Sequence, residues 1–156
     1  MKQFVIIVTG LAVLLALGLV AYEMNLGQEA GVREIIGGNG RLSLQTPAFP
    51  PGGTIAVKYT CDGENISPRL LINGVPLNAK SLALVLDDAD ADGGPLTHWA
   101  MWNIPSSITA ITEGAVPSGA VLGTTSFGTA AYRGPCPPKA ERHQYILRLY
   151  ALDTRL

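Results

Sequence analysis

Short runs that alternate apolar and polar residues, separated by segments rich in proline and glycine, constrain the fold of this chain most strongly. A period of two places successive side chains on opposite faces of a β-strand. Segments such as "TPAFPPGG" and "YRGPCPPK" contain too much proline and glycine for a continuous helix. The pattern predicts an all-β sandwich or barrel with, at most, short helical turns. The expected strands are residues 54–59, 81–87, 98–104 and 145–152.

The first 40 residues differ in character from the rest. Residues 4–22 carry no charge and are rich in Val, Leu, Ile and Ala, as in a helix that spans the roughly 30 Å hydrocarbon core of a membrane. Lys2 precedes this segment and Glu23 follows it, so we expect the amino terminus inside and the rest outside. We favour a transmembrane anchor over residues 1–22, with a cleaved signal peptide as the alternative. Residues 23–40 then form a linker, and residues 41–156 form one domain, membrane-anchored on the extracytoplasmic side, or exported to the periplasm or secreted.

The expected domain has a balanced charge and two cysteines. From residue 41 onward it contains nine Lys and Arg residues and nine Asp and Glu residues. A nucleic-acid-binding surface needs clustered positive charge, so no nucleic-acid partner is expected. Cys61 and Cys136 both lie in the part expected to be exported. A disulfide between them is one alternative, and two separate thiols are the other.

The stretch "LDDADADGGPLTHW", residues 86–99, concentrates polar chemistry in one loop. Asp88, Asp90 and Asp92 match the first ligand positions of a calcium loop, but Trp99 stands where a bidentate glutamate is needed. An EF-hand is therefore not expected. A less regular, calcium-stabilised interaction domain that uses these aspartates is kept as an alternative.

Two histidines, His98 and His143, each stand near the start of an expected strand beside an unusual loop. Asp88 lies at the exit of the 81–87 strand, so a chain that folds back brings Asp88 and His98 to the same end of the sheet. Two imidazoles and a carboxylate at one rim can hold a small anion through N–H donors. A Cys–His hydrolase built on Cys136, His143 and Asp88 is disfavoured, because Cys136 lies between two prolines with no helix after it.

A series of motifs in fixed order resembles the phosphatidylethanolamine-binding proteins, in their bacterial Raf-kinase-inhibitor-like branch. The series begins with "TPAF" (46–49), "YTCDGENISPRL" (59–70), "GVP" (74–76) and "KSLALVLDDADADGGPLTHWAMWNIP" (80–105). It continues with "GPCPP" (134–138), "HQY" (143–145) and "LYALD" (149–153). The resemblance covers nearly all of residues 42–153 and implies a two-sheet antiparallel β-sandwich with a small anion pocket at one end.

The same resemblance assigns roles to individual residues. Histidine and loop backbone N–H groups would receive phosphate oxygens, while Asp88 would accept from an ammonium group or hold His98 in place. The implied function is non-enzymatic binding of a phosphate-bearing ligand, such as a phosphoethanolamine-like or phospholipid head group, with no catalytic residue, metal or cofactor. A kinase or protease inhibitor acting through protein contacts is the alternative. The implied ligand-binding residues are Asp88, His98, Gly134, Pro135, His143 and Tyr145, with Asp90 supporting the turn.

The chain departs from the family pattern at three places. Ala89 and Asp92 replace two turn prolines, so we expect a looser turn. Gln144 replaces an arginine, which removes a fixed positive charge that Arg142 can supply instead. No counterpart of the family's carboxy-terminal helical segment follows "YALD", so we expect a domain that is short at its C-terminus and exposed on that side.

Overall fold

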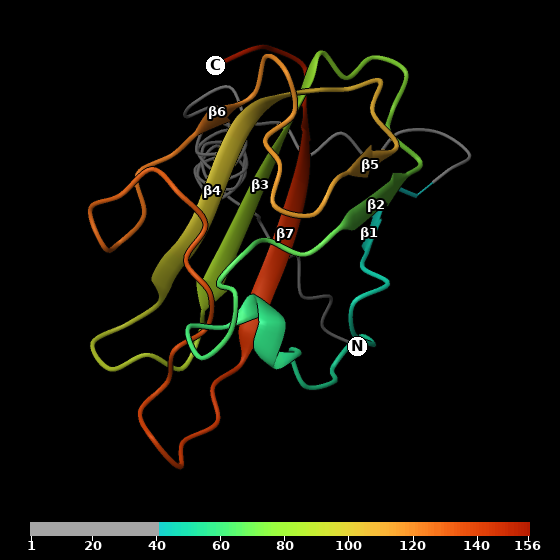
Figure 1. Cartoon of the computed structure of the whole chain (residues 1–156). Coiled ribbons are helices and arrows are strands. Elements are labelled where there is room, and N and C mark those ends of the chain that lie inside the picture. Colours follow the sequence, from blue (N-terminus) through green and yellow to red (C-terminus); the bar gives the residue numbers. More distant parts are fainter. Residues whose placement is uncertain (1–40) are drawn as a thin grey trace, which may run out of the picture. The chain divides into compact units, whose positions relative to one another are not determined.

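The computed structural model describes residues 41–156, so the expected membrane segment and linker lie outside the described residues. Within residues 41–156, no helix has the length and apolar character that crossing a membrane requires. This part of the chain forms seven strands and one short 3-10 helix (Figure 1). The elements are β1 (Ser43–Gln45), η1 (Val57–Tyr59), β2 (Leu70–Asn73), β3 (Ser81–Asp88), β4 (Leu96–Pro105), β5 (Ala110–Ile111), β6 (Val121–Leu122) and β7 (Tyr145–Leu152).

The strands form two antiparallel sheets that share one core. The smaller sheet has the order β1-β2-β5, and the larger has the order β6-β4-β3-β7. In Figure 1, β4, β3 and β7 run side by side as the three long strands. Leu70 and Ile72 of β2 belong to the same buried cluster as Leu84 of β3 and Met101 of β4. The predicted two-sheet sandwich is therefore confirmed.

The alternating pattern of β3 fixes the position of its end. Leu82, Leu84 and Leu86 are buried, whereas the residues between them are half-buried. Because side chains alternate between the two faces, slipping β3 by one residue would expose all three leucines. Burying one such side chain contributes about 1.5–3 kcal/mol, so the observed register is strongly favoured. β3 pairs with β4 on one edge and with β7 on the other, and it ends at Asp88.

The strand expected over residues 54–59 is wrong. Val57–Tyr59 forms the 3-10 helix η1 instead, with hydrogen bonds from Tyr59 N–H to Ala56 O and from Thr60 N–H to Val57 O. The alternating pattern places Val57 and Tyr59 on one face, yet Val57 is 64% exposed and Tyr59 is buried. A period of two produces a strand only where a neighbouring strand supplies the ladder, and here the backbone groups are satisfied locally.

Strand β4 departs from regular pairing at two points. Leu86 lies opposite Trp99 while the next residue of β3, Asp87, lies opposite Thr97, so His98 is an extra residue in a β-bulge. The bulge interrupts the alternation of β4, and His98 and Trp99 are both buried although they are consecutive. A second irregularity of the same pairing includes Asn103, whose φ is 55°. The amide of Asn103 binds the backbone N–H and C=O of Leu156.

Candidate functional site

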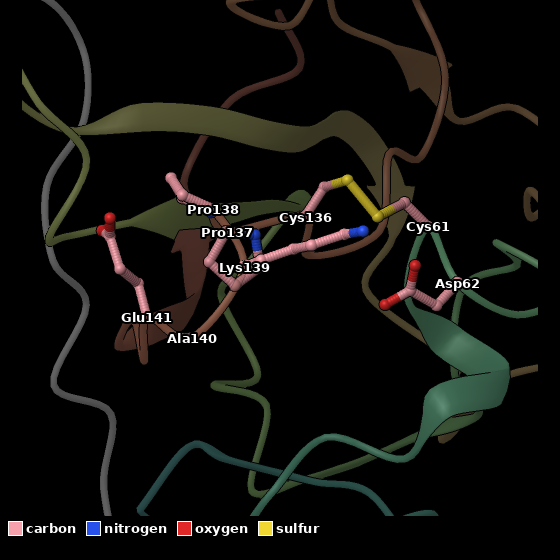
Figure 2. Close-up of a pocket in the computed structure, with 8 residues that line it drawn as sticks. All are labelled: Cys61, Asp62, Cys136, Pro137, Pro138, Lys139, Ala140 and Glu141. Atoms are coloured by element: carbon pink, nitrogen blue, oxygen red, sulfur yellow. A yellow bond between two sulfur atoms is a disulfide. The ribbon is translucent and has the colours of Figure 1, made fainter.

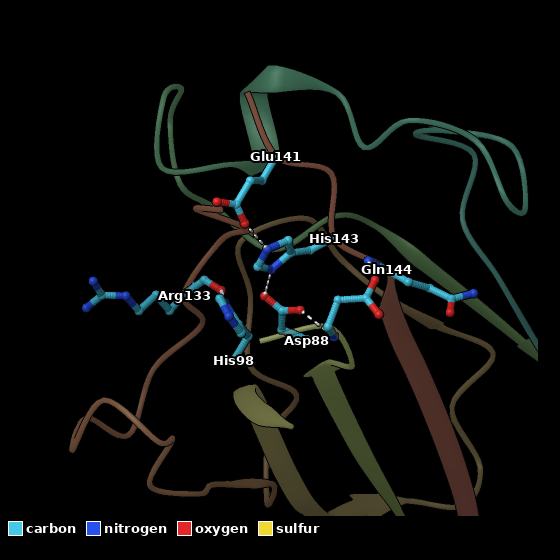
Figure 3. A network of polar contacts seen from close by, with 7 residues as sticks. Asp88, His98, Arg133, Glu141, His143 and Gln144 are labelled. Atoms are coloured by element: carbon cyan, nitrogen blue, oxygen red, sulfur yellow. Dashed lines mark hydrogen bonds and ion pairs between the residues drawn. The ribbon is translucent and has the colours of Figure 1, made fainter. Parts of the chain in front are cut away.

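Four of the expected site residues meet at one end of the larger sheet. Asp88 ends β3 directly opposite Tyr145, which begins β7. His98 lies in the bulge of β4, on the other edge of β3. The rings of His98 and Tyr145 meet edge to face, with their centroids 5.2 Å apart. His143 precedes β7 by two residues and reaches the same place, as Figure 3 shows.

Asp88 is a buried carboxylate with both oxygens engaged. Its side chain is 5% exposed. Oδ2 accepts a hydrogen bond from Nδ1 of His143 at 2.8 Å, and Oδ1 accepts one from the N–H of Asp90 at 3.1 Å. Burial alone would raise the pKa of Asp88, but the His143 hydrogen bond, the nearby Tyr145 hydroxyl and the Asp90 N–H outweigh it and lower that pKa below its ordinary value of 3.8. Of the two roles that the resemblance implies for Asp88, holding His98 is not among its hydrogen bonds here, which go to His143 and Asp90.

His143 lies between two carboxylates. Nδ1 faces Asp88, and Nε2 lies 3.2 Å from Oε2 of Glu141 (Figure 3). A carboxylate can only accept, so making both contacts requires hydrogen on both ring nitrogens, which is the imidazolium form. The hydrogen bond to Asp88, followed by that to Glu141, raises the pKa of His143 above its ordinary value of 6.5. These two contacts therefore favour the cationic form of His143 at the rim of the site.

Backbone contacts with Gln144 fix the loop that follows β3. Oδ2 of Asp90 accepts from the N–H of Gln144 at 2.7 Å, and the N–H of Ala89 donates to the Gln144 carbonyl at 2.9 Å. Asp90 therefore supports the turn, as expected, by tying it to the segment before β7. These bonds hold the turn although both family prolines are absent. They also place His143, the neighbour of Gln144, against Asp88.

His98 is oriented by Arg133, which directly precedes the Gly-Pro loop of residues 134–138. It is 3% exposed, and its Nδ1 lies 2.9 Å from the carbonyl of Arg133, while the N–H of Arg133 donates to the carbonyl of His98. Because a carbonyl only accepts, Nδ1 carries hydrogen and is committed to Arg133, which leaves Nε2 as the ring nitrogen without this contact. The ring packs against Phe127, over which the Arg133 guanidinium lies at 4.2 Å. In Figure 3 that guanidinium points away from Asp88.

Gly134 and Pro135 pack tightly against the segment that contains Tyr59 and Cys61. A Cβ at Gly134 would lie 2.4 Å from the carbonyl oxygen of Tyr59, so only glycine fits there. The N–H of Gly134 donates to Oδ1 of Asn65 at 2.7 Å, and the carbonyl of Pro135 accepts from the N–H of Cys61. The Gly134 N–H is thus already paired with Asn65 in this structure.

A disulfide joins Cys61 to Cys136, whose Cα atoms are 5.4 Å apart. It ties the loop after η1 to the Gly-Pro loop, and both cysteines are exposed. While the bond is intact Cys136 has no thiolate, so it cannot act as the nucleophile of a Cys–His hydrolase. Within residues 41–156 no three His, Cys, Asp or Glu side chains are grouped as a metal site requires. The oxygens of Asp88 and Asp90 are directed at backbone N–H groups and at His143 instead of at a common point.

The hydroxyl of Tyr145 is a buried polar group without a partner. Within residues 41–156 it forms no hydrogen bond of normal geometry, although it lies near enough to the Asp88 carboxylate to interact with it. Burial, followed by the nearby Asp88 carboxylate, raises the pKa of Tyr145, so the phenol is neutral and retains its O–H. An unpaired buried hydroxyl costs about 1–3 kcal/mol, and such groups in folded proteins often mark functional positions.

Two hollows lie beside these residues. The first, of about 450 Å³, is lined by the disulfide, Pro137, Pro138, Ala140 and three charged residues, as Figure 2 shows. The second, of about 240 Å³, lies next to Trp99 and Tyr132. Neither is lined by Asp88, His98 or His143, and only the first reaches this network, through Glu141. The charged residues of the first hollow are Asp62, Lys139 and Glu141.

Three further residues that shape the site are not among those predicted from the sequence: Asn65, Arg133 and Glu141. Asn65 and Arg133 act on residues distant in sequence, through one amide oxygen and one backbone carbonyl. The one available signal was local, because Glu141 stands two residues before His143 in "KAERH". An exposed glutamate in a loop is ordinary, so this spacing alone does not reveal a contact.

Comparison with known proteins places the chain in a family. Residues 45–156 match the family model described as phosphatidylethanolamine-binding protein. A UPF0098 protein of Methanothermobacter thermautotrophicus is 52% identical over 120 residues, which cover 74% of this chain and 79% of that protein. A UPF0098 protein of Pyrococcus horikoshii is 42% identical over 135 residues, covering 81% and 68% of the two chains.

Solved structures agree with this assignment. A phosphatidylethanolamine-binding protein homologue from Chlamydia trachomatis superposes with a TM-score of 0.71 at 37% identity, covering 76% of this chain and 79% of the other. Escherichia coli YbcL, described as a member of the mammalian family, gives a TM-score of 0.69 at 33% identity over 72% and 77% of the two chains. Residues 45–156, which the family model matches, contain the larger sheet, strands β2 and β5 of the smaller sheet, the disulfide and the network around Asp88. The chain therefore belongs to the phosphatidylethanolamine-binding protein family.

Proposed function

We propose that this protein is a binding module without enzymatic activity, and that it holds a small phosphate-bearing ligand at the end of the β4-β3-β7 sheet. The observation that carries the proposal is that a positively charged hydrogen-bond donor and an unsatisfied hydroxyl donor both lie beside Asp88. His143 is an imidazolium held by Asp88, and the buried Tyr145 hydroxyl beside Asp88 has no hydrogen-bond partner within the described residues. A phosphate oxygen accepts from both kinds of donor.

His98 adds a third contact of a different kind. Its Nδ1 is committed to the Arg133 carbonyl, which leaves Nε2 as an acceptor in the neutral ring. A phosphate that keeps one proton can donate its O–H to Nε2 while its other oxygens accept from Tyr145 and His143. This arrangement replaces the expectation that both histidines donate.

A phosphoethanolamine head group fits these charges and the family name. The Asp88 oxygens are already engaged, so they are poor acceptors for an ammonium group. Asp62 and Glu141, in the hollow beside the disulfide, offer exposed carboxylates near the network. We therefore assign the ammonium end of such a ligand to that side of the site.

The states of the cysteines and of Asp88 support the proposal of binding without reaction. The two cysteines are joined, and Asp88 is an acceptor with a lowered pKa, so neither supplies an activated nucleophile or a raised-pKa acid. We also propose that the domain functions outside the cytoplasm, tethered through residues 1–22. An exposed disulfide persists in oxidising compartments, which supports that location.

A titration of the full chain in a maltoside detergent tests the proposed function. The ring signals of His98 and His143 are followed by NMR with inorganic phosphate, phosphoethanolamine and calcium in turn. The signals of both rings should shift when either phosphate compound is added, and for each compound the two rings should give the same dissociation constant. Neither ring should respond to calcium. If no phosphate compound moves either ring, the proposal fails and a protein partner becomes the better explanation. A response to calcium alone favours the calcium-stabilised alternative.

A further inference from the structure

Glu141 occupies a donor that the proposed ligand needs. Its Oε2 lies 3.2 Å from Nε2 of His143, on the opposite side of the ring from Asp88 (Figure 3). The Asp88 carboxylate holds Nδ1, so Nε2 is the remaining N–H of this imidazolium. In the free protein, therefore, both donors of His143 point at carboxylates of the same chain.

A tight turn delivers Glu141 to this position. The N–H of Glu141 donates to the carbonyl of Pro138 at 3.0 Å, and Ala140 has a φ of 72°. A positive φ at the third residue of a hydrogen-bonded turn is the type II geometry, which usually has glycine there. Cys136, two residues before Pro138, is fixed by the disulfide. The carboxylate thus projects from an anchored loop.

The two carboxylates on His143 differ in how firmly they are held. The Asp88 side chain is 5% exposed and also accepts from the Asp90 N–H. The Glu141 side chain is 57% exposed, and among the described residues its carboxylate makes one hydrogen bond, the one to His143. Glu141 borders the open hollow of Figure 2, so it can leave His143 without unpacking the core. Asp88 is the permanent partner and Glu141 the exchangeable one.

We propose that the Glu141 carboxylate is a built-in competitor that occupies Nε2 of His143 and must be displaced by the phosphate of the ligand. The inference rests on the proposed function, because it names the residue that sets the affinity and charge selectivity of the same site. A ligand with one negative charge gains little by replacing a tethered carboxylate of equal charge. Inorganic phosphate with two negative charges and one remaining proton gains more and can still donate its O–H to His98, so Glu141 selects for the doubly charged form.

Four proteins test this: the full-length wild type and the variants Glu141→Gln, Glu141→Asp and Glu64→Gln. Glu141→Gln removes the competing charge, and Glu141→Asp keeps the charge but shortens the reach. Glu64→Gln is the matched control, since Glu64 is exposed and changes the net charge equally. Inorganic phosphate is the probe, with the His143 ring as reporter. Before phosphate is added, the pH midpoint of His143 should fall in Glu141→Gln and stay constant in Glu64→Gln.

An exposed ion pair shifts an equilibrium by about two- to fivefold. Both Glu141 variants should therefore bind phosphate about two- to fivefold more tightly than the wild type, and Glu64→Gln should match the wild type. If the wild type binds phosphate and the Glu141 variants bind it equally or more weakly, the competitor role is overturned while the proposed function stands. If the His143 midpoint is unchanged in Glu141→Gln, the contact is absent and the competitor role is likewise overturned. If neither the wild type nor any variant responds to phosphate, both the inference and the proposed function fail.

Discussion

Replacing Tyr145 by phenylalanine should change stability and ligand binding in opposite directions. The substitution removes one oxygen atom, which is buried and has no hydrogen-bond partner within the described residues. An unsatisfied buried hydroxyl costs about 1–3 kcal/mol, and part of this is offset because the hydroxyl helps to lower the pKa of Asp88. We expect a net gain of about 1 kcal/mol in the free energy of unfolding. For a domain of this size, that gain raises Tm by about 4 °C.

Phosphate binding should weaken in the same variant. A hydrogen bond to a charged group contributes about 1.5–3 kcal/mol, so losing the Tyr145 donor should raise the dissociation constant by roughly tenfold or more. Thermal unfolding without phosphate measures the first effect, and the histidine-ring titration measures the second. Tyr150→Phe is the control, because Tyr150 lies half-buried in the same strand, away from its Asp88 end. A variant that is less stable than the wild type would show that the hydroxyl is satisfied by Asp88, and unchanged phosphate affinity would show that it does not face the ligand.

Three further predictions concern the elements that hold the site. Replacing both Cys61 and Cys136 by serine removes the disulfide and should lower the free energy of unfolding by about 4 kcal/mol, because the bond closes a loop with a sequence separation of 75 residues. Denaturant unfolding of the wild type and the double variant measures this difference. Equal unfolding midpoints would contradict the prediction. The Asp88–His143 pair should stabilise the fold most between pH 3.8 and pH 6.5. Because the pKa of Asp88 is lowered in the folded state, this stabilisation is lost as pH falls below that range and Asp88 is protonated. Because the pKa of His143 is raised in the folded state, the stabilisation is lost as pH rises above that range and His143 loses its proton. The stability difference between the wild type and Asp88→Asn, followed against pH, should therefore be largest inside this window, and a difference that does not vary with pH would refute the pairing. Ala140→Gly should raise the free energy of unfolding by about 0.5–1 kcal/mol in chemical denaturation, because glycine adopts the positive φ of 72° without strain; a loss of stability would show that the turn differs.

The long strands were predictable because their patterns agree with their pairing. Residues 81–87 alternate so that Leu82, Leu84 and Leu86 are buried, and in residues 145–152 alternate side chains pack against the same core. Strands β3 and β7 follow the two ranges to within one residue. Strands β1, β2, β5 and β6 are two to four residues long, which is too short for a period of two to stand out. Residues 54–59 alternate equally well, but no partner strand is available to them. A pattern therefore predicts a strand only together with its neighbour.

For the site, the residue types were predictable and the partners were not. Asp88, His98, His143 and Tyr145 do meet at one end of the sheet, as the strand ends and the family motifs indicate. The residue that binds Asp88 was not predictable, and neither was the bulge at His98, because a bulge is a property of cross-strand register that one strand does not reveal. The pairing of Gly134 with Asn65 joins residues 69 positions apart. Such contacts follow from the fold and have no local sequence signal.

The most direct test of the account is a crystal structure of the protein bound to phosphoethanolamine. The account predicts density for the phosphate within hydrogen-bond distance of Nε2 of His143 and the hydroxyl of Tyr145, with the Glu141 carboxylate turned away from the ring. The Asp88–His143 hydrogen bond should be unchanged. Density for the ligand elsewhere, or a Glu141 carboxylate still bound to His143 beside an occupied site, would contradict the account.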